Sequence, residues 1–223
     1  MRPGGGSYAH LDEAELVALF RARDAGAVRY VATCNNQRLF RAAWAVLRDS
    51  AEAEDAVQSA YLKAFAAIDT FEGRSKLSTW LTRIVINEAR VRRRSARRRA
   101  ALLGHAMPPG TDIGEEVDAA YQTPEQHVAN LQLRKALEQA LGSLPQIYRT
   151  VFILREIEGM TVEETAAALD ILPATVKTRL FRARHMLQAR LSSLDRTALK
   201  GVLAFGGKIC AALTARVLLA IAA

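Results

Sequence analysis

The chain has 223 residues, half of them hydrophobic, and a formal net charge of +8, so it can bury one large core or two small ones and favours a polyanionic partner. Its two isolated cysteines, Cys34 and Cys210, exclude a disulfide framework and a zinc-type spacing, and its four scattered histidines form no ligand cluster. Alanine, leucine, arginine and glutamate dominate while alternating β-branched runs are scarce, so we predict an all-α protein of two small helical domains joined by a flexible linker.

The first predicted domain contains four helices, preceded by a glycine-rich N-terminus that we expect to be disordered. The spacing of apolar residues places the helices at about residues 12–20, 28–47, 51–68 and 78–99, and it leaves room for an interruption of the second near residues 34–36. Acidic residues near the start of the third helix suit its dipole. A polar loop at residues 70–76 separates the third helix from the fourth.

The loop and the fourth helix carry the residue types of a nucleic-acid contact. Phe71 and Trp80 flank the loop, and aromatic rings beside cations hold single-stranded bases by stacking. Arg83 and the arginine run at residues 90–99 can follow phosphates, and Asn87, one turn after Arg83, offers a donor and an acceptor to a base edge. The alternative interpretation is that Trp80 is a core residue and that the arginine run is a solvated helix end.

The second predicted domain contains a helix-turn-helix. Thr161 and Glu164 have the spacing of a capping box, and Pro173 stands where one helix ends and the next begins. A helix from about residue 174 turns aliphatic side chains inward and cations outward, as a probe for the major groove does. The residues that we expect to face DNA are Thr175, Lys177, Thr178, Arg179, Phe181, Arg182 and Arg184. The alternative is a solvated basic helix in an ordinary bundle.

The last 32 residues are strongly apolar. A membrane span needs about 20 uninterrupted apolar residues, and here Lys208 and Arg216 interrupt the run. We therefore favour a packed or partner-binding amphipathic helix over a membrane anchor, and we expect no membrane association.

These patterns together predict the organisation of the chain. The predicted segments are a disordered N-terminus (1–10), a first domain (11–100), a linker rich in glycine, proline and acids (101–127), a second domain (128–191) and an apolar C-terminal extension (192–223). The helices predicted in the second domain are at residues 128–141, 146–156, 162–169 and 174–191.

Two sets of motifs, in this order and at this separation, resemble the extracytoplasmic-function sigma factors of the sigma-70 family, the small promoter-recognition subunits of bacterial RNA polymerase. The motifs are at residues 53–65 and 71–87 in the first domain and at residues 144–145, 154–156, 159–166 and 175–184 in the second. The resemblance covers roughly residues 15–191 and implies that residues 11–100 are sigma region 2 and residues 128–191 are sigma region 4. Departures from the family pattern are Ala174, where glycine is usual, and Lys177, where arginine is common.

The resemblance also implies roles for individual residues. Asp55 and Gln58 match positions that dock on the clamp helices of the polymerase largest subunit. Residues that match the contact with the upstream melting element of the promoter, including the pocket for a flipped base, are Phe71, Gly73, Ser75, Trp80, Arg83 and Asn87. The helix that contains Lys177, Arg179 and Arg182 matches the one that reads the more distant promoter element. The implied function is to direct RNA polymerase to specific promoters and to assist their melting, in the cytoplasm and in a stress or envelope response. The implied partners are core RNA polymerase, promoter DNA and, as a regulator, an anti-sigma factor.

Two other classes of protein fit the sequence less well. A stand-alone repressor usually dimerises to read half-sites one turn apart, but the sequence shows no dimerisation heptads and the first domain would be left unexplained. An enzyme would need a nucleophile with its base, a phosphate-binding loop or a metal spacing, and we find none of these in the sequence. We therefore predict no catalytic residues, no cofactor, no metal and no small-molecule substrate.

Overall fold

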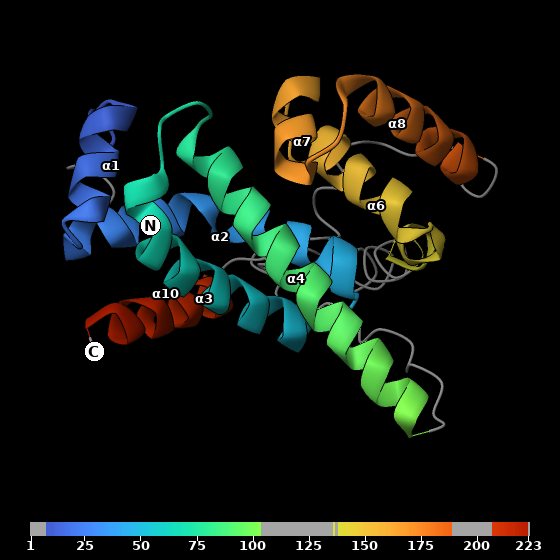
Figure 1. The fold of residues 1–223 in the computed structure, drawn as a ribbon, viewed down its shortest axis with the longest axis horizontal. Helices are drawn as coiled ribbons and strands as arrows, with labels where there is room; N and C mark the ends of the chain where they lie inside the picture. The colour runs from blue at the N-terminus through green and yellow to red at the C-terminus, as the bar shows by residue number, and fades with distance from the viewer. Residues whose placement is uncertain (1–7, 104–135, 137, 189–206, 223) are drawn as a thin grey trace, which may run out of the picture.

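The computed structural model describes residues 8–103, 136, 138–188 and 207–222, and the described residues form helices and turns, without a strand (Figure 1). The prediction of an all-α protein is thus confirmed. Several predicted segments lie wholly or partly outside the described residues: most of the N-terminus 1–10, most of the linker 101–127, residues 128–135 and 137 of the first helix of the second domain, and residues 189–206 and 223.

Aspartates start the first three helices. Asp12 precedes α1 (Glu13–Arg21) and forms a capping box with Glu15; Asp24 precedes α2 (Ala25–Leu47), and Asp49 precedes α3 (Ser50–Ala67). Each carboxylate accepts a hydrogen bond from a backbone amide of the first turn, which would otherwise lack a partner. A single 3-10 turn, η1 (Ile68–Thr70), follows α3.

The helix α2 is continuous, so the interruption considered near residues 34–36 is absent. Both asparagines of that segment are buried and satisfied inside the fold. Asn35 donates its amide to the Val31 carbonyl one turn earlier (2.8 Å), and Asn36 bonds to Thr214 of a distant helix (2.9 Å). The Val31 carbonyl has two lone pairs and can accept this bond beside its helical one, and Asn36 bonds away from its own helix, so the helix continues.

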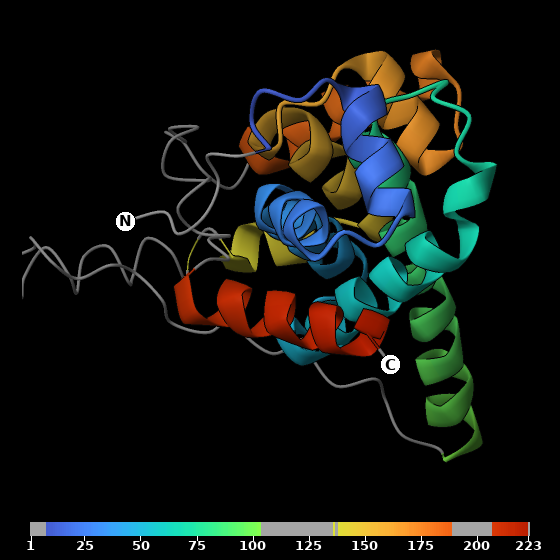
Figure 2. The ribbon, with the colours of Figure 1, turned by 90° about the vertical axis from the view of Figure 1, so that its left-hand side faces the viewer.

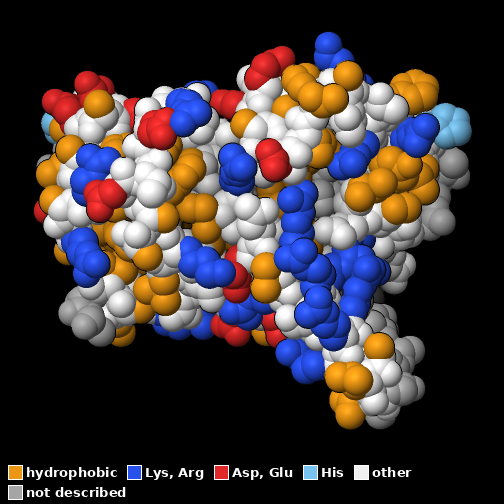
Figure 3. Space-filling model, in the orientation of Figure 1, with side chains coloured by type: hydrophobic (Ala, Val, Ile, Leu, Met, Phe, Trp, Pro, Cys, Tyr) orange, Lys and Arg blue, Asp and Glu red, His pale blue; other side chains and the backbone are white. Residues whose placement is uncertain are grey.

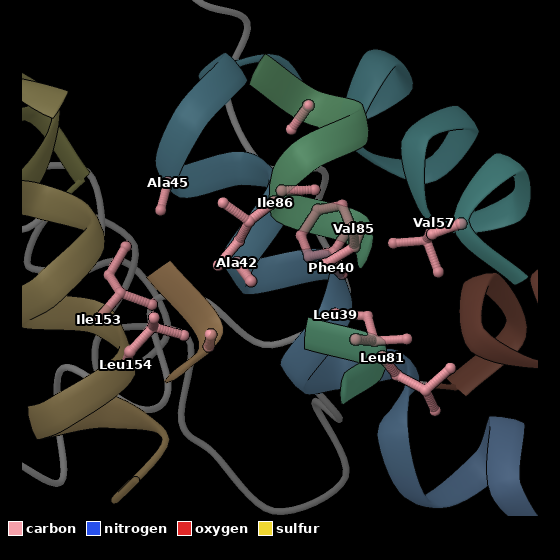
Figure 4. Packing of buried hydrophobic residues seen from close by; sticks show 14 of the residues in the cluster. Leu39, Phe40, Ala42, Ala45, Val57, Leu81, Val85, Ile86, Ile153 and Leu154 are labelled. Carbon is pink, nitrogen blue, oxygen red and sulfur yellow. The ribbon is translucent and has the colours of Figure 1, made fainter. Parts of the chain in front are cut away.

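The long helix α4 (Leu77–Leu102) contains the whole arginine run, and its last turns extend beyond the rest of the molecule (Figure 1). Its N-terminus has no side-chain cap of its own. Instead the Leu77 amide donates to the carboxylate of Glu13 on α1 (2.5 Å), which fixes where the polar loop ends and the helix begins. Figure 4 shows Leu81, Val85 and Ile86 of α4 packed with Leu39 and Phe40 of α2 in the centre of this core.

The second module consists of α6 (Gln146–Phe152), the π-helical turn η2 (Ile153–Ile157), α7 (Val162–Leu169) and α8 (Pro173–Gln188). Its core is continuous with the first, since α6 and η2 pack on α2 and α7 packs on α4. In Figure 4, Ala42 and Ala45 of α2 face Ile153 and Leu154 of η2. Small side chains on α2 therefore allow the second module to approach closely.

Buried charges fasten the two modules together. The Arg41 guanidinium on α2 lies 2.7 Å from the Glu158 carboxylate, and their side chains are 6% and 8% exposed. Arg149 of α6 donates to the carbonyl of Ala45 (2.7 Å) and to two carbonyls of its own module. Burial, with other arginines nearby, lowers the pKa of Arg149 to about 9.

The tail helix α10 (Gly207–Ala222) lies against α2 and α3 (Figure 2). The sequence favoured a packed or partner-binding helix over a membrane anchor, and in the structure this helix packs on the first module. Among the described helices, none combines the length and the apolar character needed to cross a bilayer.

Candidate nucleic-acid interface

The turn between α7 and α8 is built by local interactions. The Thr161 hydroxyl accepts from the Glu164 amide (3.0 Å) while the Glu164 carboxylate accepts from the Thr161 amide (2.8 Å), so the predicted capping box is present. Asp170 ends α7 in the left-handed conformation (φ 57°), which an aspartate tolerates better than most residues. Pro173 then begins α8, where its fixed φ suits the first helical position.

The outer face of α8 presents a mixed cationic and aromatic surface. Val176, Leu180 and Leu187 are buried as expected. Lys177, Thr178 and Arg182 are exposed, Thr175 and Arg179 are half-buried, and the Phe181 side chain is 71% exposed. The Phe181 ring is thus largely available to a partner. The surface suits the edge of a base pair with phosphates on either side.

Two of the predicted arginines of α8 already have side-chain partners within the module. The Arg182 guanidinium donates to the Tyr148 hydroxyl (3.2 Å) and remains exposed. Arg184 forms an ion pair with Glu156 (2.6 Å), whose side chain is only 8% exposed. Arg184 therefore holds α8 against η2, a structural role that the sequence did not indicate.

The aromatic pair of the first module lies at the edge of its core. The rings of Phe71 and Trp80 are 5.2 Å apart and tilted by 55°, and both are half-buried. Trp80 is thus neither fully a core residue nor fully free, and one part of the ring is accessible. Gly73, with φ +69°, lets the exposed loop turn above this pair, and Ser75 is half-buried in the same loop.

The cations of α4 face the end of α7. Arg83, Asn87 and Arg90 are spaced at helical intervals along one stripe. Arg83 lies 3.7 Å from the Asp170 carboxylate, and Arg90 donates to the Leu169 carbonyl (3.3 Å). Cations at the last carbonyls of a helix are favourable because its dipole is negative there. Asn87 is exposed, and its side-chain carbonyl accepts a long bond from Arg90 (3.5 Å).

The two predicted nucleic-acid contacts meet at one pocket. A hollow of about 290 Å³ lies between α4 and the second module and is lined by Arg90, Arg93, Arg94, Arg97 and, from α8, Arg179, beside Gln146 and Thr150. Burial lowers the pKa of Arg90 and of Arg93, with further lowering from the neighbouring arginines. In Figure 3 the blue side chains of lysine and arginine gather along the C-terminal half of α4. Such a surface favours a polyanion, because each neutralised phosphate releases counterions.

Asp55 and Gln58 lie together on α3. Asp55 is exposed and Gln58 is half-buried. Beside them Glu54 forms an ion pair with Arg216 of α10 (3.0 Å), and Arg216 also lies 3.9 Å from Asp55. Sequence reasoning did not predict this neighbour, although Arg216, on an apolar helix, calls for a carboxylate partner.

Among the described residues, no group of three or more histidines, cysteines or acids is placed to hold a metal ion. The charged residues that sequence reasoning missed are those between the modules, Arg41, Arg149 and Glu158. These residues belong to no recognisable sequence motif. They are buried because the two modules pack together, which cannot be predicted from local sequence patterns.

Comparison with known proteins identifies both modules. The model of sigma-70 region 2 matches residues 31–99, and that of sigma-70 region 4 matches residues 134–187. The RNA polymerase sigma-H factor of Pseudomonas aeruginosa is 33% identical over 162 residues, which are 68% of this chain and 79% of that protein. The ECF RNA polymerase sigma-E factor of Escherichia coli K12 is 33% identical over 156 residues, 66% of this chain and 78% of that protein.

Solved structures agree on the fold. The sigma factor RpoE of Bartonella quintana, in complex with the anti-sigma factor NepR, superposes with a TM-score of 0.58 at 23% identity, covering 82% of this chain and 95% of that one. CnrH in complex with the cytosolic domain of CnrY superposes with a TM-score of 0.54 at 22% identity, covering 79% and 95%. The tail helix α10 lies outside both matched regions.

Proposed function

The chain belongs to the extracytoplasmic-function sigma factors of the sigma-70 family, which direct RNA polymerase to promoters, and we propose that its two basic surfaces divide one promoter between them. The protein is a transcription initiation factor and not an enzyme. Its work is binding: free energy gained on DNA and polymerase offsets the cost of opening base pairs. One observation supports the assignment of sites. The chain combines a capped helix-turn-helix that has an exposed cationic face with an aromatic pair that lies beside a cationic helix.

On the more distant promoter element, α8 enters the major groove of duplex DNA. Lys177, Arg179 and Arg182 supply cations, and an arginine can fork onto the O6 and N7 atoms of guanine. Phe181 offers an exposed apolar ring to a thymine methyl group. Thr175 and Thr178 lie on the same helix and complete the contact, and Arg184 supports it by anchoring α8 to Glu156.

On the melting element, the loop with Gly73 and Ser75 and the ring of Phe71 form the pocket for a base flipped out of the duplex. Flipping costs a few kcal/mol, which stacking and edge hydrogen bonds offset. Asn87 selects the base, Trp80 stacks at the fork, and Arg83 binds the backbone. The exposed positive-φ glycine gives the loop the backbone freedom to close over a base.

Polymerase binds the α3 surface that carries Asp55 and Gln58. Both are polar, and their side chains are accessible in part or in full on one helix, as a protein contact requires. Because the end of α7 in the second module binds Arg83 and Arg90, we infer that the modules separate before α4 and α8 hold their two promoter elements. The protein acts in the cytoplasm, in a stress or envelope response, and an anti-sigma factor, such as the one bound in the Bartonella quintana neighbour, restrains it.

Run-off transcription with purified core polymerase tests this function. Adding the chain to core enzyme and a promoter library should yield discrete start sites, and Arg182→Ala should lower their yield while Arg29→Ala, which removes an exposed arginine of α2, should not. Transcription that does not depend on the chain would refute the proposal.

A further inference from the structure

The tail helix α10 packs on the first module by one apolar face. Leu213 and Val217, one turn apart, are completely buried, while Leu219 on the outer face is 73% exposed. Cys210 and Thr214 lie on the same inward face at helical spacing. The helix therefore occupies a surface formed by α2 and α3 (Figure 2).

Polar groups in that surface are arranged for a helix. The side-chain amide of Asn36, completely buried on α2, donates to the Thr214 hydroxyl (2.9 Å) and to the Cys210 carbonyl (3.4 Å). Its carbonyl accepts from the hydroxyl of Tyr61 on α3 (3.0 Å). Asn36 lies inside the segment that matches sigma-70 region 2, whereas both of its partners on α10 lie outside it. The Asn36 amide N–H group is thus bonded to α10, while Tyr61 of α3 satisfies its carbonyl, so a buried donor of this surface has its partners on the helix that covers it.

Charge fixes the position of α10 along α3. Arg216 pairs with Glu54 (3.0 Å) and approaches Asp55 (3.9 Å). Asp55 is the residue proposed above for polymerase docking. The ion pair of Arg216 is with Glu54, next to Asp55, whose own side chain is 57% exposed. Because α10 covers the apolar surface beside these residues, a second helix could not pack there at the same time.

We propose that α10 occupies the polymerase-docking surface in cis, so that polymerase binds α3 only when α10 has left it. The proposal rests on the assignment of Asp55 to the polymerase contact. The surface takes a helix that presents two aliphatic side chains one turn apart, a hydroxyl and a flanking cation. Because α10 belongs to the same chain, a competitor faces an effective concentration on the order of millimolar.

The test compares two substitutions on one helix. Leu213→Asp places a charge in the buried face, and Leu219→Asp places the same charge on the exposed face. Binding of fluorescently labelled core polymerase to the full-length chain is measured by titration. We expect Leu213→Asp, and deletion of residues 207–223, to tighten binding about tenfold or more, and Leu219→Asp to leave it unchanged. Equal affinities for the two substituted proteins, or weaker binding by the Leu213→Asp protein, would overturn the proposal.

A peptide experiment decides the matter if Leu213→Asp disturbs the fold. A synthetic peptide of residues 207–223 is added to the chain that lacks this segment, in the presence of polymerase. The peptide should displace polymerase, and the same peptide with Leu213→Asp should not; failure of the natural peptide to compete overturns the inference. Asp55→Ala in the shortened chain separates the two proposals. If it leaves polymerase affinity unchanged, the assignment of Asp55 fails, whatever the tail does.

Discussion

Glu158→Gln removes one charge from the contact between the two modules and keeps the shape of the side chain. In the structure the Glu158 carboxylate lies 2.7 Å from Arg41 and 3.6 Å from Arg38, and the Arg41 side chain is only 6% exposed. Removing one partner of a buried ion pair costs about 3–5 kcal/mol, because the other charge stays out of water and loses its opposite charge. At about 1.4 kcal/mol for each factor of ten, this would shift the equilibrium a hundredfold or more.

The cost should appear as separation of the modules and not as unfolding. Arg41 lies where η2 meets α2, so moving the second module away lets water reach the guanidinium while the helices within each module stay packed on one another. Glu158→Gln can therefore destabilise the protein by no more than the free energy with which the second module closes on the first. We expect the protein with Glu158→Gln to keep its helical content and to populate an open arrangement that the unaltered chain rarely visits.

Spin labels on the two modules measure the opening. One label is attached to Cys34, exposed on α2, and the other to a cysteine introduced by His185→Cys, exposed on α8, with Cys210→Ser to avoid a third site. Pulsed electron paramagnetic resonance should show a longer and broader distribution of distances between the two labels after Glu158→Gln. Glu163→Gln, at an exposed acid of the same module, is the matched control. An unchanged distribution, with an unchanged unfolding midpoint, would refute the claim that this ion pair holds the modules together.

Three further outcomes are expected. Arg182→Ala should weaken binding to duplex promoter DNA by about 1–3 kcal/mol if the contact is bidentate; fluorescence anisotropy with Arg29→Ala as control measures this, and equal losses would mean a non-specific effect of charge. Asp55→Ala, made in the chain without residues 207–223, should reduce co-purification with core polymerase at unchanged helical content; full recovery of the complex would count against the docking role. The hydrogen bond from Lys76, followed by that from the Thr161 amide, lowers the pKa of Glu164 below its ordinary value of 4.5, so its contribution to stability is complete above that pH and is lost as the pH falls through the lowered pKa. Acid titration of the unfolding free energy should therefore be shallower after Glu164→Gln, and identical curves would contradict the sign.

Local chemistry made much of this fold predictable. Thr161 and Glu164 form the capping box that their spacing indicates, and Pro173 begins α8 as a first-turn proline should. The inward positions of α8 are those that the apolar spacing selects. Such features depend on residues within one or two turns of each other, and they can be read along the chain for that reason.

The arrangement of the helices depends on long-range contacts that the sequence does not display. Asn36 looked like a weak point of a helix, but it is a buried partner for a residue 178 positions away. Arg216 looked like an interruption of an apolar run, but it pairs with Glu54 on α3. In both cases a polar residue in an apolar pattern signalled a tertiary contact, and the sequence could not tell which element would supply it.

The contacts between modules and the proposed contacts with DNA use the same charges, and this competition has a consequence for selectivity. Lys76 is paired with Glu164 (2.8 Å), and Arg83 and Arg90 bind the end of α7. DNA that binds α4 must replace these contacts, so the apparent dissociation constant rises in inverse proportion to the open fraction. Non-specific binding is weak, with dissociation constants of about 10⁻⁴–10⁻⁶ M at physiological salt. A closure free energy of about 3 kcal/mol would leave about one per cent of the molecules open. The apparent dissociation constant for non-specific DNA would then be about a hundredfold higher.

Bulk DNA then competes poorly for the closed protein. Polymerase and a promoter together engage α3, α4 and α8, and their combined binding free energy can exceed that of closure. A chain opened by Glu158→Gln should therefore bind random duplex DNA more tightly by the same factor by which its open fraction increases, while its preference for promoter over random DNA at the level of α8 should not change. An equal gain in affinity for promoter and for random DNA would show that closure limits access to the cations and does not alter how any one of them reads a base.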